Sequence, residues 1–123
     1  MVSIAIIGAS KRRDKFGNKS VRAHVQQGWT VYPIHPFDSE IEGLKSYSSI
    51  KDLPEIVDRV ALYVPPTIGV KVLDEIAEAG SPEVFINPGA GSLELRSRAE
   101  ELGVPYRDAC AIVAIGESPS SYP

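Results

Sequence analysis

The chain is predicted to be an α/β protein from three observations: its alternating segments, its first apolar run and the turn that ends this run. Short runs rich in β-branched residues alternate with amphipathic segments along the sequence. Residues 2–7 are almost all apolar, as is typical of a parallel strand buried on both faces. They lead into the small-residue turn Gly8-Ala9-Ser10 and then a helical pattern. Since βαβ crossovers are right-handed, we expect a single Rossmann-like, doubly wound and mainly parallel sheet with helices on both faces.

Five short segments are predicted to be strands, because they are apolar and rich in β-branched residues. They are residues 2–7, 30–34, 60–64, 84–86 and 104–106. Between the second and third of these, the chain is rich in turn residues around Gly43, and a short edge strand is expected near Leu44.

Three amphipathic segments, residues 20–27, 68–79 and 93–102, are predicted to be helices from the spacing of their apolar residues. In the first of them, Val25 is expected to face the core. The neighbouring His24 is expected to be a partly exposed helix residue.

Individual residues also predict helix ends, one further helix and the form of the C-terminal segment. Ser92 is predicted to cap the third helix and Gly103 to end it. A shorter helix is predicted over residues 48–53, before a proline. From about residue 110 to residue 123 the sequence predicts an irregular tail.

Composition restricts the function classes. A chain of 123 residues is expected to form one domain, residues 1–123. A net charge of −3 gives no general positive field, so we expect no nucleic-acid partner. The single cysteine excludes an internal disulfide, and no apolar run is long enough for a signal peptide or a membrane span. A cytoplasmic protein without membrane contact is therefore predicted.

The carboxyl ends of the strands are the expected ligand site, as in other doubly wound sheets. Three segments should meet there, residues 8–18, 35–38 and 64–68, and residues 87–92 should lie further along the same rim. The first segment combines a tight turn, the start of a helix and a basic stretch that holds four of the 13 Lys and Arg residues, at positions 11–15. Backbone N–H groups and cations in this arrangement attract a phosphorylated ligand.

Several common sites are disfavoured. The glycine pattern of dinucleotide-binding folds is missing, because the next glycine after Gly8 is Gly17, and the second predicted strand ends in Ile34-His35-Pro36 rather than in an acid. No Gly-Lys-Ser/Thr follows for a P-loop. No nucleophile or carboxylate is spaced to orient either histidine, Cys110 is interpreted as a small buried apolar residue, and no Cys/His pattern suggests zinc. No catalytic or metal-binding residue is therefore predicted.

Five ordered segments resemble a known family. They are Ile6-Ile7-Gly8-Ala9-Ser10, Lys15-Phe16-Gly17-Asn18, Val31-Tyr32-Pro33-Ile34-His35-Pro36, Tyr63-Val64-Pro65-Pro66 and Phe85-Ile86-Asn87-Pro88-Gly89. Because these segments occur in this order and at this spacing, the chain resembles the small CoA-binding proteins that have a Rossmann-like domain. That domain is related to the CoA-binding domain of succinyl-CoA synthetase alpha subunits and ADP-forming acyl-CoA synthetases.

The resemblance implies that the glycine turn and basic loop hold CoA phosphates, while the end of the second strand and the Val-Pro-Pro segment flank the adenosine half. Together with the rim positions, the predicted cofactor-binding residues are Gly8, Ala9, Ser10, Lys11, Lys15, Phe16, Gly17, Asn18, His35, Pro36, Val64, Pro65, Pro66, Asn87 and Gly89. The family often has Asn in place of His35 and Lys in place of Phe37, so one phosphate contact is not accounted for by the resemblance.

The predicted function is non-catalytic binding of coenzyme A or an acyl-CoA. A second hypothesis is the CoA-binding subunit of an acyl-CoA ligase that needs a partner chain, because the related ligases use a histidine on a following domain. A third is an NAD(P)-binding oxidoreductase or redox-sensing domain, and a fourth is a Rossmann-like scaffold whose pocket has decayed. A homo-oligomer or a protein partner is compatible with each of them.

Overall fold

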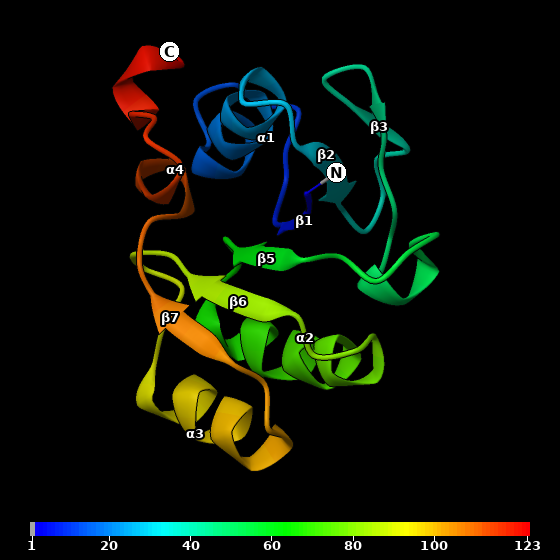
Figure 1. Cartoon of the computed structure of the whole chain (residues 1–123), viewed down its shortest axis with the longest axis vertical. Helices are drawn as coiled ribbons and strands as arrows, with labels where there is room; N and C mark the ends of the chain where they lie inside the picture. The colour runs from blue at the N-terminus through cyan, green and yellow to red at the C-terminus, as the bar shows by residue number, and fades with distance from the viewer. Residues whose placement is uncertain (1) are drawn as a thin grey trace.

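A five-stranded parallel sheet forms the centre of the computed structural model, which describes residues 2–123 (Figure 1). Its strand order is β2-β1-β5-β6-β7, and every neighbouring pair is parallel. The strands are β1 (Ser3–Ile7), β2 (Thr30–Ile34), β5 (Arg59–Leu62), β6 (Glu83–Ile86) and β7 (Tyr106–Asp108). The predicted fold class, an α/β sheet of Rossmann-like topology, is confirmed.

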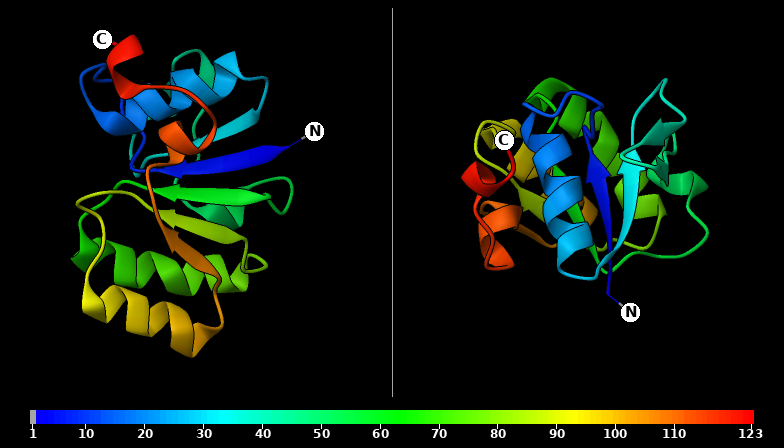
Figure 2. Two further views of the ribbon diagram at one scale, coloured as in Figure 1. Left: turned by 60° about the vertical axis from the view of Figure 1, so that its left-hand side comes forward. Right: turned by 90° about the horizontal axis from the view of Figure 1, so that it is seen from above.

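Helices cover both faces of the sheet (Figure 2). α1 (Phe16–Gln26) and the short α4 (Ala111–Ala114) lie on one face, and α2 (Pro66–Glu78) and α3 (Leu93–Leu102) lie side by side on the other. The direction in which successive strands are added to the sheet reverses between β1 and β5. β2 lies on one side of β1, and β5 lies on its other side. Ligands of doubly wound sheets bind beyond the strand ends at such a switch point.

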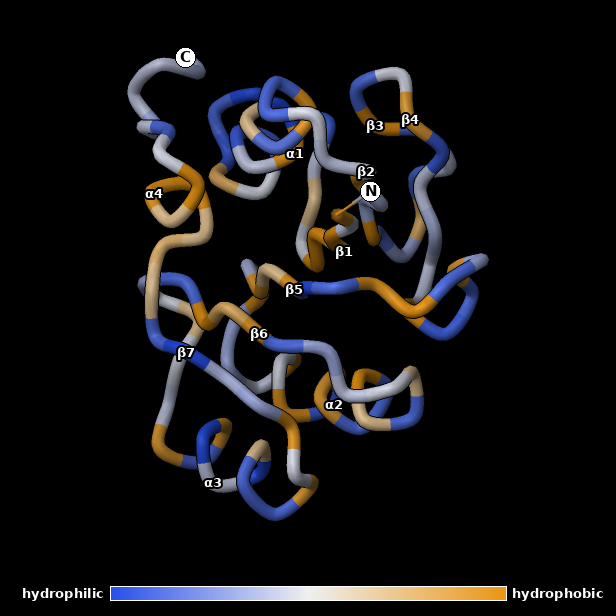
Figure 3. The backbone as a smooth tube through the Cα atoms, viewed as in Figure 1, coloured by the Kyte–Doolittle hydropathy of each residue, from blue (hydrophilic) through white to orange (hydrophobic). Residues whose placement is uncertain are grey.

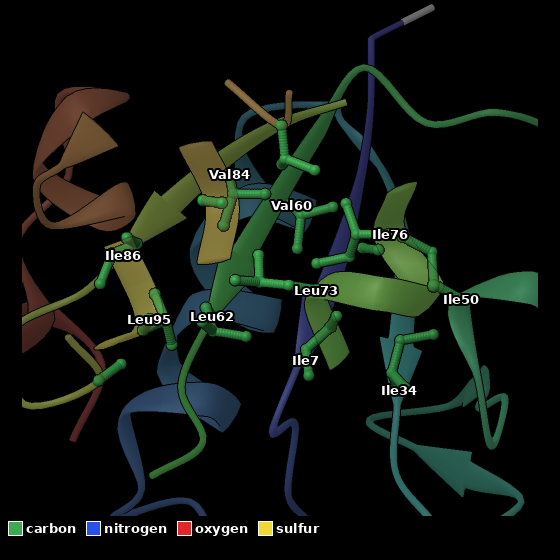
Figure 4. Close-up of a cluster of buried hydrophobic side chains, with 14 of the residues drawn as sticks. Ile7, Ile34, Ile50, Val60, Leu62, Leu73, Ile76, Val84, Ile86 and Leu95 are labelled. Carbon is green, nitrogen blue, oxygen red and sulfur yellow. The ribbon is translucent and has the colours of Figure 1, made fainter. Parts of the chain in front are cut away.

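β1 divides the core in two, because successive side chains of a strand point to opposite faces. Ala5 and Ile7 pack with Leu73 and Ile76 of α2, as Figure 4 shows for Ile7, Leu73 and Ile76. Ile4 and Ile6 instead pack beneath α1, on the side of Val21. All five residues of β1 are buried, which agrees with its apolar sequence.

The hydropathy pattern separates the central strand from the sheet edge (Figure 3). β1 and α4 are coloured hydrophobic, whereas β7 is hydrophilic and partly exposed. β7 also lies later in the chain than predicted. The Val104 N–H donates to Ala99 O at the end of α3, and the Pro105 carbonyl accepts from Val84 N–H, so strand pairing begins only after the predicted segment has started.

A small hairpin and a single helical turn connect β2 to β5. The hairpin consists of β3 (Glu40–Ile41) and β4 (Leu44–Lys45), which includes the edge strand expected near Leu44. The helix predicted over residues 48–53 is reduced to the single 3₁₀ turn η1 (Ile50–Asp52), whose start is capped by the Ser49 hydroxyl. The third predicted strand also ends early, since β5 stops before Val64.

α1 starts four residues earlier than predicted, and this changes which of its side chains are buried. The Asn18 and Lys19 N–H groups both donate to Lys15 O, so the helix begins directly after the basic loop. The face toward the sheet carries Val21 and His24, both fully buried, and Val25 is 48% exposed. The expectations of a core-facing Val25 and a partly exposed His24 were therefore wrong.

The last residues are more ordered than predicted. Residues 110–123 contain α4 and the 3₁₀ turn η2 (Pro119–Ser121) instead of an irregular tail. Two long-range contacts fix them: Asn87 Oδ1 accepts from Ala111 N–H at 2.9 Å, and the Arg22 guanidinium donates to Tyr122 O and Pro123 O. Among residues 2–123, none of the helices has the length and apolar character required to span a bilayer.

Candidate functional site

A cavity of about 630 Å³ lies beyond the carboxyl ends of the strands, at the switch point between β1 and β5. The segments that follow β1, β2, β5 and β6 all contribute to it. Its walls are Gly8, Ala9, Ser10, Lys15, Phe16, Gly17, His35, Pro36, Tyr63, Val64, Pro65, Pro66, Asn87, Pro88, Gly89, Ala90 and Cys110. The predicted site residues all line this cavity except Lys11 and Asn18.

Two glycines allow the β1–α1 turn to fold tightly against its neighbours. Gly8 has a φ of +92°, and a Cβ there would lie 3.0 Å from the Tyr63 carbonyl carbon. A Cβ on Gly17 would lie 2.1 Å from Gly8 O, so the first turn of α1 packs directly on the turn after β1. The N-cap residue Lys15 makes no side-chain capping bond, which leaves first-turn N–H groups for an anion.

Asn18 lies under this turn rather than in the cavity. It is fully buried, and its Nδ2 donates to Ser10 O at 2.8 Å and to Glu42 Oε2 at 3.0 Å. Its Oδ1 accepts from Arg22 Nε at 2.7 Å. Asn18 therefore fixes the position of Ser10 from behind, and its side chain is already occupied.

Carboxylates pair with most of the basic loop. Lys11 Nζ lies 3.7 Å from Asp38 Oδ1, on the side of the β2 turn. Arg12 contacts Asp14 at 3.0 Å, and Arg13 contacts Glu42 at 3.5 Å. Lys15 lines the cavity and makes no ion pair within residues 2–123. It is thus the cation of this loop that is best placed for a ligand phosphate.

The turn after β2 is organised by His35. Its Nδ1 accepts hydrogen bonds from the backbone N–H groups of Phe37, at 3.1 Å, and Asp38, at 3.0 Å. A ring nitrogen that accepts is unprotonated, so the ring proton is on Nε2. His35 therefore offers a hydrogen-bond donor, and its ring stacks edge-on against Phe37, which is 90% exposed.

The wall after β5 combines Tyr63 with Val64 and two prolines. Pro65 caps α2 and Pro66 is its first residue, so the Val-Pro-Pro segment ends one element and starts the next. The Tyr63 hydroxyl is buried without a hydrogen-bond partner among residues 2–123. Burial raises the pKa of this phenol well above its usual value, so Tyr63 is neutral.

Asn87 joins three elements at the end of β6. Its Nδ2 donates to Leu62 O at 3.0 Å, and its Oδ1 accepts from Ala111 N–H, at the start of α4. The side chain thus shapes the cavity wall and brings Cys110 to it. Cys110 is half-buried on this wall, so its interpretation as a buried core residue was wrong.

Sequence reasoning missed four wall residues: Tyr63, Pro88, Ala90 and Cys110. Tyr63 and Pro88 lie inside the segments that carry the family resemblance, which was a usable signal. Ala90 follows the last of these segments. Cys110 carried no signal, because its place depends on the Asn87 contact to the following residue.

The cavity is lined by few titratable side chains. Its titratable side chains are Lys15, His35, Tyr63 and Cys110, and no hydrogen bond connects any two of them. Within residues 2–123, no three His, Cys, Asp or Glu side chains are grouped closely enough to hold a metal ion. The groups that the cavity presents to a ligand are the Lys15 cation, backbone N–H groups at the start of α1, the His35 imidazole donor and apolar walls.

Comparison with known proteins agrees with this geometry. Residues 2–116 match the family model described as a CoA binding domain. The chain is 34% identical over 108 residues to an ADP-forming acetate–CoA ligase of Methanocaldococcus jannaschii, covering 85% of this chain and 15% of the ligase. It thus spans a small part of that relative's length.

Two solved structures are similar over nearly all of the chain. A conserved hypothetical protein from Pyrococcus furiosus is 39% identical, with a TM-score of 0.85, over 93% of this chain and 99% of that one. A dinucleotide-forming acetyl-coenzyme A synthetase from Ca. Korarchaeum cryptofilum, in complex with phosphate and ADP, is 30% identical with a TM-score of 0.78, over 87% and 25%. The fold, the matched residues and these relatives place the chain in the CoA binding domain family, related to the CoA-binding regions of ADP-forming acetyl-CoA synthetases.

Proposed function

We propose that this chain binds coenzyme A or an acyl-CoA in the cavity beyond β1 and β5, without catalysing a reaction on it. The observation that carries the proposal is the tight turn of Gly8 against Gly17, next to which the start of α1 and Lys15, unpaired within residues 2–123, line the cavity. A pyrophosphate needs such a combination of N–H donors and a cation.

The remaining walls suit the other parts of CoA. In doubly wound sheets the adenosine ribose lies beside the end of the second strand. His35 lines the cavity at that place and offers Nε2 as a donor, whereas Lys11 lies outside the cavity lining, paired with Asp38. A donor at this place favours a ribose phosphate. NAD binding commonly uses an acid here to accept from ribose hydroxyls, and Asp38, the acid that follows β2, is outside the cavity lining and paired with Lys11.

Apolar walls lead away from the phosphate end. Val64, Pro65 and Pro66 after β5, and Pro88 and Gly89 after β6, form one side of the cavity. A pantetheine arm, which is mostly apolar with two amides, is the part of CoA that suits these surfaces. The absence of any hydrogen-bonded pair of titratable side chains in the described cavity supports binding rather than catalysis.

Calorimetric titration with CoA, NAD⁺ and NADH tests this proposal. We expect CoA to bind at least about tenfold more tightly than either dinucleotide, corresponding to one or more charged hydrogen bonds. Native mass spectrometry of the purified protein would show whether CoA or an acyl-CoA copurifies. Tighter binding of NAD⁺ or NADH would overturn the proposal.

A second candidate function is the CoA-binding part of an acyl-CoA ligase that requires another polypeptide. The length of the relatives favours it, because this chain covers 15% of an ADP-forming acetate–CoA ligase. Incubation of the chain alone with ATP, CoA and carboxylic acids should give no thioester, and thioester formation would show that no partner is needed.

A further inference from the structure

A second cavity, of about 280 Å³, lies at the carboxyl ends of β6 and β7. It is lined by Ile86, Asn87, Pro88, Gly89, Gly91, Arg96, Asp108 and Ala109. Asn87, Pro88 and Gly89 also line the larger cavity, so the loop after β6 borders both spaces. Nothing in the function proposed above uses the smaller one.

The smaller cavity contains one guanidinium with spare donors. Arg96, in the first turns of α3, contacts Asp108 at the end of β7, with 3.3 Å between Nη1 and Oδ1. Arginine has five N–H donors, and no other hydrogen bond or ion pair of this guanidinium occurs within residues 2–123. The Arg96 side chain is 37% exposed and that of Asp108 is 53% exposed, so this ion pair is weak and can rearrange.

The loop is shaped to accept the guanidinium. A Cβ on Gly91 would lie 2.8 Å from Arg96 Nη1 and 3.1 Å from Ile86 Cγ2. A glycine at this position therefore lets the loop lie close to the present position of the guanidinium, and a larger residue would require Arg96 to shift. Ser92, the next residue, caps α3 and fixes the helix turn that carries Arg96.

The order of the strands indicates which part of a ligand reaches this space. The proposed adenosine end lies at β2 and the phosphates lie at β1. A pantetheine arm that continues in the same direction crosses β5 and β6, because the sheet order is β2-β1-β5-β6-β7. Its sulfur end then approaches the loop of residues 87–89, and an acyl group on the sulfur extends toward β7.

We propose that the second cavity is an acyl subsite, and that Arg96 selects short acyl groups that end in a carboxylate. This inference rests on the proposed binding of CoA. A carboxylate accepts two parallel hydrogen bonds from a guanidinium, and the spare donors of Arg96 supply them. A cavity of about 280 Å³ with an ion pair in its wall suits a small polar group better than a long alkyl chain.

Two ligands of nearly equal shape test the inference. Malonyl-CoA ends in a carboxylate, and isovaleryl-CoA has an isopropyl group in place of this carboxylate. We expect the parent protein to bind malonyl-CoA about tenfold more tightly than isovaleryl-CoA, as one charged hydrogen-bonded pair provides. In Arg96→Gln the ratio should fall to about one, while the affinity for free CoA stays within about twofold of the parent.

Arg98→Gln is the matched control. Arg98 is on the same helix with the same 37% side-chain exposure, and it pairs with Asp74 at 2.7 Å, but it lines neither cavity. Arg98→Gln should keep the parent's preference for malonyl-CoA over isovaleryl-CoA. An unchanged ratio in Arg96→Gln, or a parent that prefers isovaleryl-CoA, overturns the acyl subsite while leaving CoA binding intact. A parent that does not bind free CoA overturns the proposed function and this inference together.

Discussion

The side-chain amide of Asn18 donates a 2.8 Å hydrogen bond to the carbonyl oxygen of Ser10, eight residues earlier in the chain. The same amide contacts Glu42 on the β3–β4 hairpin, and its oxygen accepts from Arg22. One buried side chain thus connects the turn after β1, the hairpin and α1. The shape of the turn depends on a residue that does not line the cavity.

Removing this amide should destabilise the protein and weaken ligand binding. In Asn18→Ala, the Ser10 carbonyl and the Arg22 guanidinium lose a buried partner, which should cost about 1–3 kcal/mol in the free energy of unfolding. Asn18→Asp should also destabilise the protein, because its carboxylate keeps the bond from Arg22 but faces both the Ser10 carbonyl and Glu42. Urea unfolding measures the change, and equal stability of parent and Asn18→Asp would contradict the role of this network.

Lys15 should contribute more to CoA binding than Lys11. Lys15 is unpaired among the described residues and lines the cavity, whereas Lys11 lies outside it beside Asp38. We expect Lys15→Ala to lose about 1–3 kcal/mol of binding free energy and Lys15→Glu to lose more, since hydrogen bonds to charged groups have that range. Lys11→Ala should lose less, and binding should weaken as salt concentration rises.

Lys51→Ala is the control for these lysine variants. Lys51 is exposed and pairs with Glu78, the last residue of α2, whereas the first residue of that helix, Pro66, lines the cavity. Removal of Lys51 should therefore leave CoA affinity unchanged. Melting temperatures should be similar for all four variants, because surface lysines contribute little to the core. If Lys15→Glu binds CoA as well as the parent, the phosphates lie elsewhere.

The turn at Gly8 should tolerate alanine less well than the turn at Gly28, where a Cβ would contact no other atom. Gly8 and Gly28 both have positive φ, +92° and +83°, but only Gly8 would place its Cβ against another segment, 3.0 Å from the Tyr63 backbone. Both substitutions incur the backbone strain of a left-handed residue. We expect Gly8→Ala to unfold more easily than Gly28→Ala by about 1–3 kcal/mol, the usual range for overpacking. Similar unfolding midpoints for Gly8→Ala and Gly28→Ala would show that the Tyr63 backbone moves away from the new Cβ at little cost.

His24 should make the stability of the protein depend on pH in the mildly acidic range. Burial lowers the pKa of His24 below its ordinary value of 6.5. Nδ1 lies 2.8 Å from Ser20 O and therefore carries the proton, while Nε2 is buried without a partner among residues 2–123. Below pH 6.5 the unfolded state therefore binds more protons than the folded state, and the free energy of unfolding decreases as pH falls toward the lowered pKa.

Urea midpoints at about pH 7.5 and about pH 5.0 check this expectation, with His24→Asn as the comparison. Asparagine retains a donor near the position of Nδ1 but does not titrate. The difference between the two midpoints should be smaller in His24→Asn than in the parent. An equal difference in both proteins would assign the pH dependence to other groups.

Local pattern predicted most of the elements but not all of their ends. The apolar run of β1 and the Ser92 cap of α3 appear in the structure as expected, because both depend on residues adjacent in sequence. The start of α1 was missed. It depends on the Lys15 carbonyl, which accepts from two successive N–H groups, and on Gly17, which packs on the turn after β1.

The sequence by itself determined the parallel sheet, the glycine turn at the end of β1 and the rim segments that line the main cavity. Apolar periodicity and short-range turn chemistry encode these features, and the carboxyl ends of parallel strands converge wherever such a sheet forms. Thirteen of the fifteen predicted site residues line one cavity for this reason, all except Lys11 and Asn18.

Only the tertiary structure decided how the polar side chains around the cavity are used. Asn18 binds Glu42, Lys11 pairs with Asp38, and Asn87 holds the start of α4 at Ala111. Each of these partners lies far away along the chain. Crossover connections bring them together, and a burial pattern within one helix or strand carries no information about which distant group will satisfy a polar atom.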